Sequence, residues 1–387
     1  MRNLTLATSL VLAAAALAAC ADQPTTPSAR SAGPSLSSAA ACAASPTAVV
    51  STDAELRAAV AAAQPGDVIA ISGTIILPTQ VTLTTPGITL TCAGPGAGLQ
   101  VVEGSRGVLL EIAARDITVT GLHLDAEYAF GAIVGFNVFD EDFSGIRVTH
   151  NNIGCGYTVC VFFVGTQGTH ITDNHFEGDS TNTGIQFQAP YRDAAGIPIN
   201  PPDDVVISRN VMETEDSYPS SIYGAIRVRD GSNATITHND VGYGWTSGIV
   251  LTNVFNSRVE HNRINGALNY GIAVAEIVSL PVTLRGVSFT GNQVSHSGIA
   301  AMSIARACGN VFTGNNVQGN DRGAVFLAST GANVWRGNPG VVEDGGSFDC
   351  DGDGSVDPNQ ITGTSVAPGA SFAPAAHADN GRFDQLR

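Results

Sequence analysis

A recurring phrase built around asparagine constrains the fold of this 387-residue chain more than any other feature. It is clearest at residues 236–241, Ile-Thr-His-Asn-Asp-Val, and at residues 259–264, Val-Glu-His-Asn-Arg-Ile. An apolar residue three positions before and another two positions after also flank the asparagine slot of the other copies, which are Leu122, Asn151, Asn174, Asn210, Asn292, Asn315 and Asn338. From Leu122 onward, successive slots are 29, 23, 36, 29, 23, 30, 23 and 23 residues apart, a period of 23 with insertions of 6, 13, 6 and 7. Such a period predicts stacked units, each of which buries its apolar face against its neighbours.

Each copy contains short alternating segments. Val205 and Ile207, or Val287 and Phe289, are apolar at every second position, which is typical of strands and not of helices. A Gly-Ile pair starts another strand six to ten residues after the asparagine, at Gly184, Gly248, Gly271 and Gly298. We expect the asparagine to occupy the left-handed position of a sharp turn and its amide to hydrogen-bond to the next coil.

This pattern resembles the right-handed parallel β-helix of the pectate-lyase-like superfamily, whose coils carry three short strands and an asparagine ladder at one turn. The resemblance covers most of residues 50–345 and implies an all-β chain that forms a single solenoid. It does not identify a function, because this fold hosts lyases, hydrolases, epimerases, adhesins and metal-accessory proteins.

The ends of the chain predict how the solenoid is delivered and closed. Residues 1–20 are typical of a signal peptide, and Leu17-Ala18-Ala19-Cys20 resembles a bacterial lipobox, which implies lipidation of Cys20. Residues 21–50 are expected to form a flexible tether, residues 51–345 the β-helix and residues 346–387 a tail. Thr52 and Glu55 have capping-box spacing, and they predict an amphipathic helix that covers the first coil.

Composition favours an extracytoplasmic protein. The net charge is −16, only 13% of residues are charged and 44 are glycine, which argues against nucleic-acid binding. All 18 basic residues are arginine, so Schiff-base chemistry on lysine is excluded. We expect a secreted monomer that is anchored at the outer membrane or cell surface by lipid alone, without a membrane-spanning segment.

Six cysteines remain after Cys20, an even number that favours disulfides over a metal site in an oxidising compartment. Sequence cannot establish their connectivity. From their order along the chain we expect three pairs: Cys42 with Cys92, Cys155 with Cys160, and Cys308 with Cys350.

A polysaccharide cleft is predicted over the strands that begin with Gly-Ile. Their outward positions should hold Gln186, Gln188, Arg227 and Arg229, and long insertions flank them. Aromatic residues expected along the rim or in an insertion are Tyr191, Tyr218, Tyr223, Tyr243, Trp245 and Tyr270. Rings stack on sugar C–H faces while amides and guanidinium groups bind hydroxyls, so the predicted partner is an extracellular polysaccharide. Alternatively, the aromatics only stack between coils.

Two chemistries are compatible with this cleft. A uronide lyase needs a base and a cation that stabilises the enolate, and several β-helix lyases use arginine as the base, which makes Arg227 and Arg229 the candidates. A glycosidase, or an epimerase, would draw on wall carboxylates such as Glu213. The lyase is favoured among enzymes. The alternative function is a non-catalytic surface scaffold or adhesin, or a periplasmic metal-accessory protein.

Two further clusters could bind metals. An EF-hand-like spacing of oxygen ligands, with Gln360 where the motif has glutamate, predicts a weak structural calcium site at Asp349, Asp351, Asp353, Ser355 and Asp357. His238 and His261 precede ladder asparagines and should lie about 5 Å apart, the strand spacing. Two ligands without a third favour turn polarity over copper or zinc at that position.

Overall fold

The computed structural model describes residues 42, 45–105, 107–137, 142–178, 183–193, 196–214, 223–274, 284–327 and 329–368. Within these ranges the chain forms three long parallel sheets, a two-stranded hairpin and one helix, α1 (Asp53–Ala62). No helix in the described ranges has the length and apolarity to cross a membrane. The predicted lipidation site Cys20 and rim residue Tyr218 lie outside the described residues.

Sheet A contains the strands that precede the asparagine slots. Its thirteen strands are β1 (Ala48–Val50), β2 (Val68–Ile71), β5 (Thr89–Cys92), β8 (Thr118–Thr120), β11 (Arg147–Thr149), β14 (His170–Thr172), β19 (Val206–Ser208), β22 (Thr235–Thr237), β25 (Arg258–Glu260), β29 (Ser288–Thr290), β33 (Val311–Thr313), β35 (Val334–Arg336) and β37 (Gln360–Thr362).

Sheet B contains the strands that follow the slots. Its nine strands are β3 (Thr74–Leu77), β6 (Gly98–Val101), β9 (His123–Asp125), β12 (Asn152–Gly154), β15 (His175–Gly178), β20 (Val211–Thr214), β23 (Asp240–Val241), β26 (Arg263–Asn265) and β30 (Gln293–Ser295).

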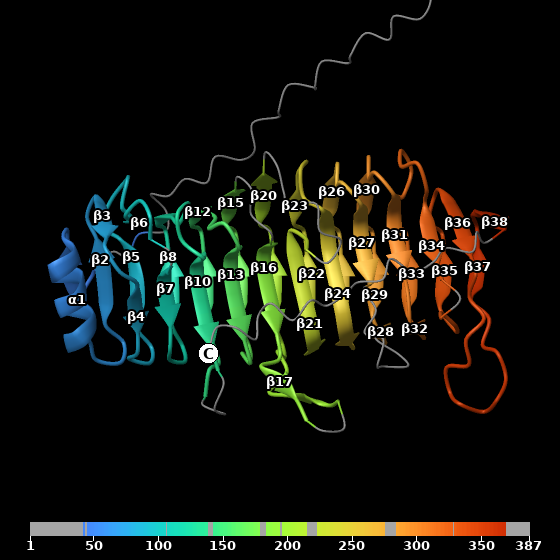
Figure 1. Cartoon of the computed structure of the whole chain (residues 1–387), viewed down its shortest axis with the longest axis horizontal. Helices are drawn as coiled ribbons and strands as arrows, with labels where there is room; N and C mark the ends of the chain where they lie inside the picture. Colours follow the sequence, from blue (N-terminus) through green and yellow to red (C-terminus); the bar gives the residue numbers. More distant parts are fainter. Residues whose placement is uncertain are drawn as a thin grey trace, which may run out of the picture. The chain divides into compact units, whose positions relative to one another are not determined.

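Sheet C completes each coil. Its fourteen strands are β4 (Val81–Leu83), β7 (Val108–Ile112), β10 (Gly131–Phe136), β13 (Val159–Val164), β16 (Thr183–Gln188), β21 (Ile226–Ser232), β24 (Ser247–Phe255), β27 (Tyr270–Val274), β28 (Leu284–Arg285), β31 (Ala300–Ile304), β32 (Ala307–Cys308), β34 (Ala324–Phe326), β36 (Val341–Asp344) and β38 (Ser365–Pro368). The chain passes from A to B to C and then begins the next coil, and the coils stack from α1 toward β38 (Figure 1). This is the predicted right-handed parallel β-helix.

The core runs along the inside of the stack. Alternate apolar side chains of the strands point inward, and neighbouring coils align these residues in rows such as Ile185, Ile226, Ile249 and Ile272. Phe289 and Phe312 stack inside sheet A with ring centroids 4.5 Å apart. Each fully buried side chain contributes roughly 1.5–3 kcal/mol through removal from water, so the repeat stabilises itself coil by coil.

The asparagine ladder is present as predicted. From Asn174 onward, the Oδ1 atom of each ladder asparagine accepts hydrogen bonds from the backbone N–H and the side-chain amide of the asparagine one coil earlier, as between Asn239 and Asn262 at 3.0 and 2.9 Å. The ladder asparagines are Asn151, Asn174, Asn210, Asn239, Asn262, Asn292, Asn315 and Asn338. They are buried, so these bonds satisfy amides that no water can reach.

The expectation that asparagine itself is left-handed is wrong. The residue before it has positive φ, for example 56° at His238 and 54° at His261. The turn therefore uses the preceding residue for the strained conformation and directs the asparagine side chain into the stack, where it bonds to backbone and amide groups. A second ladder, which the sequence analysis missed, joins Asn310, Asn333 and Asn359 between sheets C and A.

All three predicted disulfides are present: Cys42–Cys92, Cys155–Cys160 and Cys308–Cys350. The capping box of α1 also forms, because Thr52 Oγ1 accepts from the Glu55 N–H while the Glu55 carboxylate accepts from the Thr52 N–H. Leu56 and Val60 of this helix are buried in the hydrophobic core. The helix covers the end of the stack at β1, β2 and β3, as a solenoid with an apolar interior requires (Figure 1).

The predicted boundary at residue 345 is wrong. Strands β37 and β38 pair in parallel with β35 and β36, so the β-helix continues to residue 368. The acidic segment therefore belongs to a loop within the last coils and not to a tail. The sequence conceals this coil because it lacks the asparagine phrase.

Candidate functional site

The outer face of sheet C at β16, β21 and β24 carries the outward polar residues that were predicted to form the floor of the cleft. Strand register aligns Gln186 with Arg227 and Val250 in one row, and Arg229 with Thr252 in the next. The intervening residues point into the core, as expected from the alternation. Sequence periodicity was therefore sufficient to separate inward from outward residues here.

Most of this floor is covered. Gln186 is 2% exposed and Arg227 is 6% exposed, although both point away from the core. Gln188 and Arg229, one row nearer the C-terminal ends of the strands, are half-buried and reach solvent. The Gln186 amide donates to Gln188 Oε1 at 3.0 Å. The accessible part of the floor thus lies at the ends of the strands.

A hairpin formed by β17 (Tyr191–Arg192) and β18 (Pro198–Ile199) lies at these strand ends (Figure 1). Its Arg192 guanidinium forms an ion pair with the buried carboxylate of Asp230. Arg229 Nε is 3.4 Å from the other oxygen of Asp230, and Asn253 Nδ2 donates to Asp230 at 2.6 Å. One carboxylate therefore holds two guanidinium groups from different segments, and we call Arg192, Arg229 and Asp230 the arginine clasp.

Asp230 has φ of 58°, a conformation that aspartate adopts more readily than most residues. Arg229 was predicted from the sequence as a site residue, whereas Arg192 and Asp230 were not. Asp230 follows the alternating Arg-x-Arg segment directly and resembles any acid at a strand end. Its role depends on the hairpin, whose docking has no local sequence signal.

The aromatic residues separate into distinct environments. Tyr191, which precedes Arg192 on the hairpin, is 45% exposed, and Tyr243 is 66% exposed at the turn from sheet B to sheet C. Tyr223 is half-buried. Tyr270 packs against Val250 and Ala273 on the outer face of sheet C, and this burial raises the pKa of its phenol.

Trp245 does not belong to the rim. It is fully buried in the core, and its indole Nε1 is 3.4 Å from the backbone oxygen of Met212. The prediction that it contacts substrate is wrong. Gly244, which lies between Tyr243 and Trp245, has a positive φ of 100°. This turn breaks the alternation that would place both rings on one face, and only Trp245 points inward.

Glu213 also lies apart from the arginines. It is on β20 in sheet B, where register aligns it with Glu177 on the outer face, and its carboxylate is 3.4 Å from His175 Nε2. The predicted grouping of Glu213 with Arg227 and Arg229 is therefore not assembled, since two different sheets carry these residues. Sequence placed all of them near an insertion but could not specify the sheet.

The acidic loop brings three carboxylates close together. Ligand oxygens of Asp349, Asp351 and Asp353 lie within 4.8 Å of one another. The Asp349 carboxylate accepts from the Gly352 and Gly354 N–H groups at 2.7 and 2.8 Å. Hydrogen bonds from Ser355 hold the pKa of Asp353 below its usual value, so this carboxylate is readily ionised.

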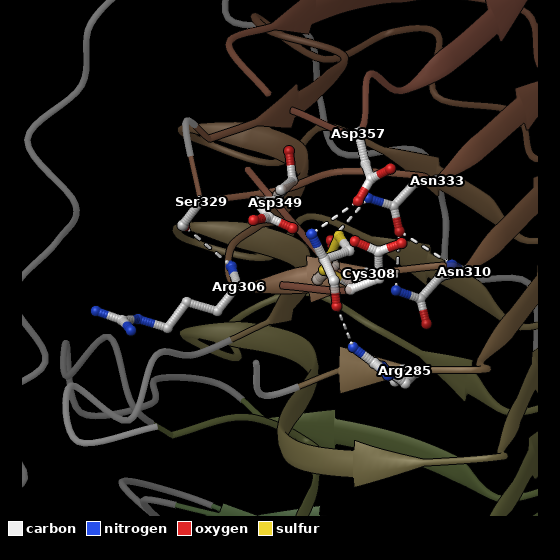
Figure 2. Close-up of a disulfide and its surroundings, with 12 residues drawn as sticks. Arg285, Arg306, Cys308, Asn310, Ser329, Asn333, Asp349 and Asp357 are labelled. Carbon is white, nitrogen blue, oxygen red and sulfur yellow. Dashed lines mark hydrogen bonds between the residues drawn. A yellow bond between two sulfur atoms is a disulfide. The ribbon is translucent and has the colours of Figure 1, made fainter. Parts of the chain in front are cut away.

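The last disulfide anchors this loop, as Figure 2 shows. Cys350 bonds to Cys308 of β32, and Arg285 Nη2 donates to the Cys350 backbone oxygen at 2.8 Å. Asp357 accepts from the Cys350 N–H at 2.8 Å, so one of its carboxylate oxygens closes the loop. The fold thus presents three carboxylates on a covalently fixed loop.

The residues before the ladder asparagines form side-chain pairs. The His238 and His261 rings stack at 5.1 Å with an interplanar angle of 15°, close to the expected separation. Asp173 and Arg209 form a two-point ion pair at 2.7 Å for each contact. Burial acts to raise the pKa of Asp173, but Arg209 outweighs it and holds the pKa below the usual value.

Comparisons with known proteins give one family profile and several similar solved structures. A family profile described as right handed beta helix region matches residues 160–339. An alginate lyase from Paenibacillus sp. is 15% identical with a TM-score of 0.47, over 71% of this chain and 94% of that chain. A surface adhesin of Streptococcus pneumoniae is 11% identical with a TM-score of 0.47, over 81% and 87%.

A mannuronan C-5 epimerase A-module from Azotobacter vinelandii is 12% identical with a TM-score of 0.46, over 83% of this chain and 94% of that chain. No curated protein matches the chain. The matched profile and the sheet topology agree that the chain folds as a right-handed parallel β-helix.

Proposed function

We propose that this protein binds an acidic extracellular polysaccharide at the C-terminal ends of the sheet C strands. The arginine clasp is the observation that carries the proposal. Asp230 holds the guanidinium groups of Arg192 and Arg229, and the hairpin that carries Arg192 also carries the exposed side chain of Tyr191. Guanidinium groups bind carboxylates with two parallel hydrogen bonds, and tyrosine stacks on the C–H face of a sugar.

Local contacts and not long-range attraction would drive this binding, because the whole chain has a net charge of −16. The guanidinium groups of Arg192 and Arg229 both contact the carboxylate of Asp230, so two cationic groups lie close together. Such a pair favours a uronate, whose carboxylate can accept hydrogen bonds from guanidinium groups, over a neutral sugar.

If the bound chain is also cleaved, β-elimination is the favoured chemistry. A base removes the proton next to the uronate carboxylate, the glycosidic C–O bond breaks, and a cation stabilises the enolate. Arg227 is the candidate base and Arg229 the candidate cation. The burial of Gln186 and Arg227 favours the alternative of a non-catalytic binding scaffold, since a sugar seated on the clasp has no open path to these two residues.

One experiment separates these functions. Polygalacturonate, alginate and glycosaminoglycans are incubated with the protein, and both retention on the polymer and absorbance of unsaturated product are measured. Binding that the Arg229→Ala variant loses supports the proposal, and product in addition establishes a lyase. Absence of binding to every acidic polymer contradicts the proposed function.

We also propose that the protein is secreted and anchored by a lipid at Cys20. Secretion and lipidation at Cys20 agree with three disulfides, which form in oxidising compartments. A Cys20→Ser variant should move from the membrane fraction to the soluble fraction. We further propose that the acidic loop binds one calcium ion and that the protein is a monomer.

A further inference from the structure

A cavity on the opposite flank of the solenoid from the arginine clasp collects three histidines. Its volume is about 310 Å³, and it lies beside the asparagine ladder where sheet A turns into sheet B. His123, His150 and His175 line it, together with Asn152 and small residues that include Gly121. None of these side chains belongs to the proposed polysaccharide site.

The stacking of coils brings the three imidazoles together. Strands β9, β12 and β15 are adjacent, and their register aligns His123, Asn152 and His175 in one outward row. His123 and His175 are therefore two strand spacings, roughly 9.6 Å, apart along the stack. His150 comes from the coil between them, at the left-handed position before ladder residue Asn151. Three consecutive coils thus contribute one ring each.

The cavity exists because glycines stand at positions of its wall where other residues would place a side chain. Gly121 occupies the slot before the ladder position one coil earlier than His150, and Gly96 lines the same wall. In the following coils this slot holds Asp173, Arg209 and His238. The His150 ring therefore faces an unfilled position, whereas His238 is stacked on His261.

The cavity is rich in electron-pair donors. Neutral imidazole presents one unprotonated nitrogen, and the Asn152 Oδ1 atom is buried with no hydrogen-bond donor among the described residues. The His175 ring also lies between two carboxylates, 3.3 Å from Glu177 at Nδ1 and 3.4 Å from Glu213 at Nε2. Such lone pairs with negative charge close by favour a cation and disfavour an anion.

We propose that His123, His150 and His175 bind a divalent transition-metal ion of the zinc type. Imidazole nitrogen suits zinc, copper and nickel, whereas calcium and magnesium prefer oxygen. A carboxylate on the second ring nitrogen is the usual partner of a metal-ligating histidine, and Glu177 and Glu213 supply it to His175. Both His175 nitrogens face these carboxylates, at 3.3 and 3.4 Å, so metal binding requires the ring to turn until one nitrogen enters the cavity while the other keeps its carboxylate partner.

Binding would draw the rings inward. Zinc–nitrogen bonds are about 2.0–2.1 Å, so ligand atoms on one ion lie roughly 3.3 Å apart. Among the described residues only the acidic trio of the C-terminal loop already has its ligand atoms clustered. The histidines surround a space that rotation of their side chains can close, and the ladder beneath them holds the backbone fixed.

The test is a titration of the untagged, calcium-loaded protein with Zn²⁺ by calorimetry, followed by Co²⁺ absorbance to report nitrogen ligation. We expect one equivalent to bind, and we expect the His123→Asn, His175→Asn double variant to weaken binding at least tenfold, in line with the loss of metal ligands. The His238→Asn, His261→Asn variant is the matched control and should bind normally. An Asp351→Asn variant separates this site from the acidic loop.

Loss of binding without loss of the cooperative thermal transition supports the site. A wild-type protein that binds no Zn²⁺, or binding that the double histidine variant leaves unchanged, overturns it. If the double variant fails to fold, His150→Asn alone provides the test, because its ring is exposed and its removal leaves both strands intact.

Discussion

The outer faces of sheets A and C contrast although the same coils form them. Sheet A presents a row of small hydroxyl side chains, among them Thr120, Thr149, Thr172 and Thr237, which are half-exposed. The corresponding row of sheet C holds Val134, Phe162, Gln186, Arg227 and Val250, which are buried. Sheet A turns directly into sheet B, whereas the insertions with the hairpin and the acidic loop follow sheet C.

The repeat therefore determines the interior of the solenoid, whereas the insertions determine how its outer faces differ. β-Branched threonine satisfies an exposed strand without any ligand, so the face of sheet A is explained by strand preference. The face of sheet C carries buried charge that strand preference does not explain. Sheet C and its loops therefore carry the proposed polysaccharide site.

The largest expected effect is a difference in unfolding free energy between variants of a core residue and an exposed residue of the same turn. Trp245→Ala removes a fully buried ring and should cost about 3–5 kcal/mol in the free energy of unfolding. Tyr243→Ala, at a side chain that is 66% exposed, should stay within about 0.5 kcal/mol. Urea denaturation of both variants measures this, and equal costs would contradict the placement of Trp245 in the core.

The next effect concerns calcium at the insertion after β36. Saturating Ca²⁺, at a hundred times its Kd, should stabilise the protein by about 2.7 kcal/mol if only the folded loop binds it. Differential scanning calorimetry with Ca²⁺ and with chelator should show the shift in Tm, and Asp351→Asn should abolish it. A shift that persists in Asp351→Asn would place the ion elsewhere.

A smaller effect compares arginines on the two faces. Arg229→Ala on sheet C should weaken binding of an acidic oligosaccharide about tenfold to a hundredfold, the loss of roughly 1.5–3 kcal/mol from a charged hydrogen bond. Arg258 lies on the outer face of sheet A, where it donates to Thr235 Oγ1 at 3.2 Å. Arg258→Ala is the control and should bind normally in the same calorimetric titration.

The smallest effect is a pH dependence at the turn between sheets A and B. The pKa of Asp173 is lower in the folded protein, so its ion pair with Arg209 stabilises the fold above the unfolded-state pKa near 3.9. That stability is lost as the pH falls through the folded pKa. Because Arg209 is largely exposed, we expect less than about 1 kcal/mol. Asp173→Asn should flatten the stability profile of the wild type between about pH 5 and pH 2.

Sequence predicted the interior well for physical reasons. Inward and outward residues alternate with a period of two. Asparagine recurs at the same slot of successive coils, as at Asn239 and Asn262, because only its amide completes the ladder. The expected disulfides join cysteines that are consecutive along the chain, and they are present because a coil stack keeps residues that are near in sequence near in space. The left-handed residue was assigned one position late because histidine, aspartate and arginine at that position carry no common signal.

The candidate site was only partly predictable. Gln188 and Arg229 were located from alternation, whereas Asp230 and Arg192 meet through a hairpin whose docking is not repetitive. Glu213 was assigned to an insertion beside the cleft, whereas strand β20 of sheet B extends through it and aligns it with Glu177. The insertions lack the sequence period from which the coils were predicted, so their contacts could not be predicted in the same way.

Binding of a size-defined acidic oligosaccharide to the wild type and to Asp230→Asn, measured by calorimetry, tests the arginine clasp most directly. Removing the charge that holds Arg192 and Arg229 should weaken binding at least tenfold while the thermal transition stays cooperative. Unchanged affinity in Asp230→Asn would show that the clasp is not the ligand site.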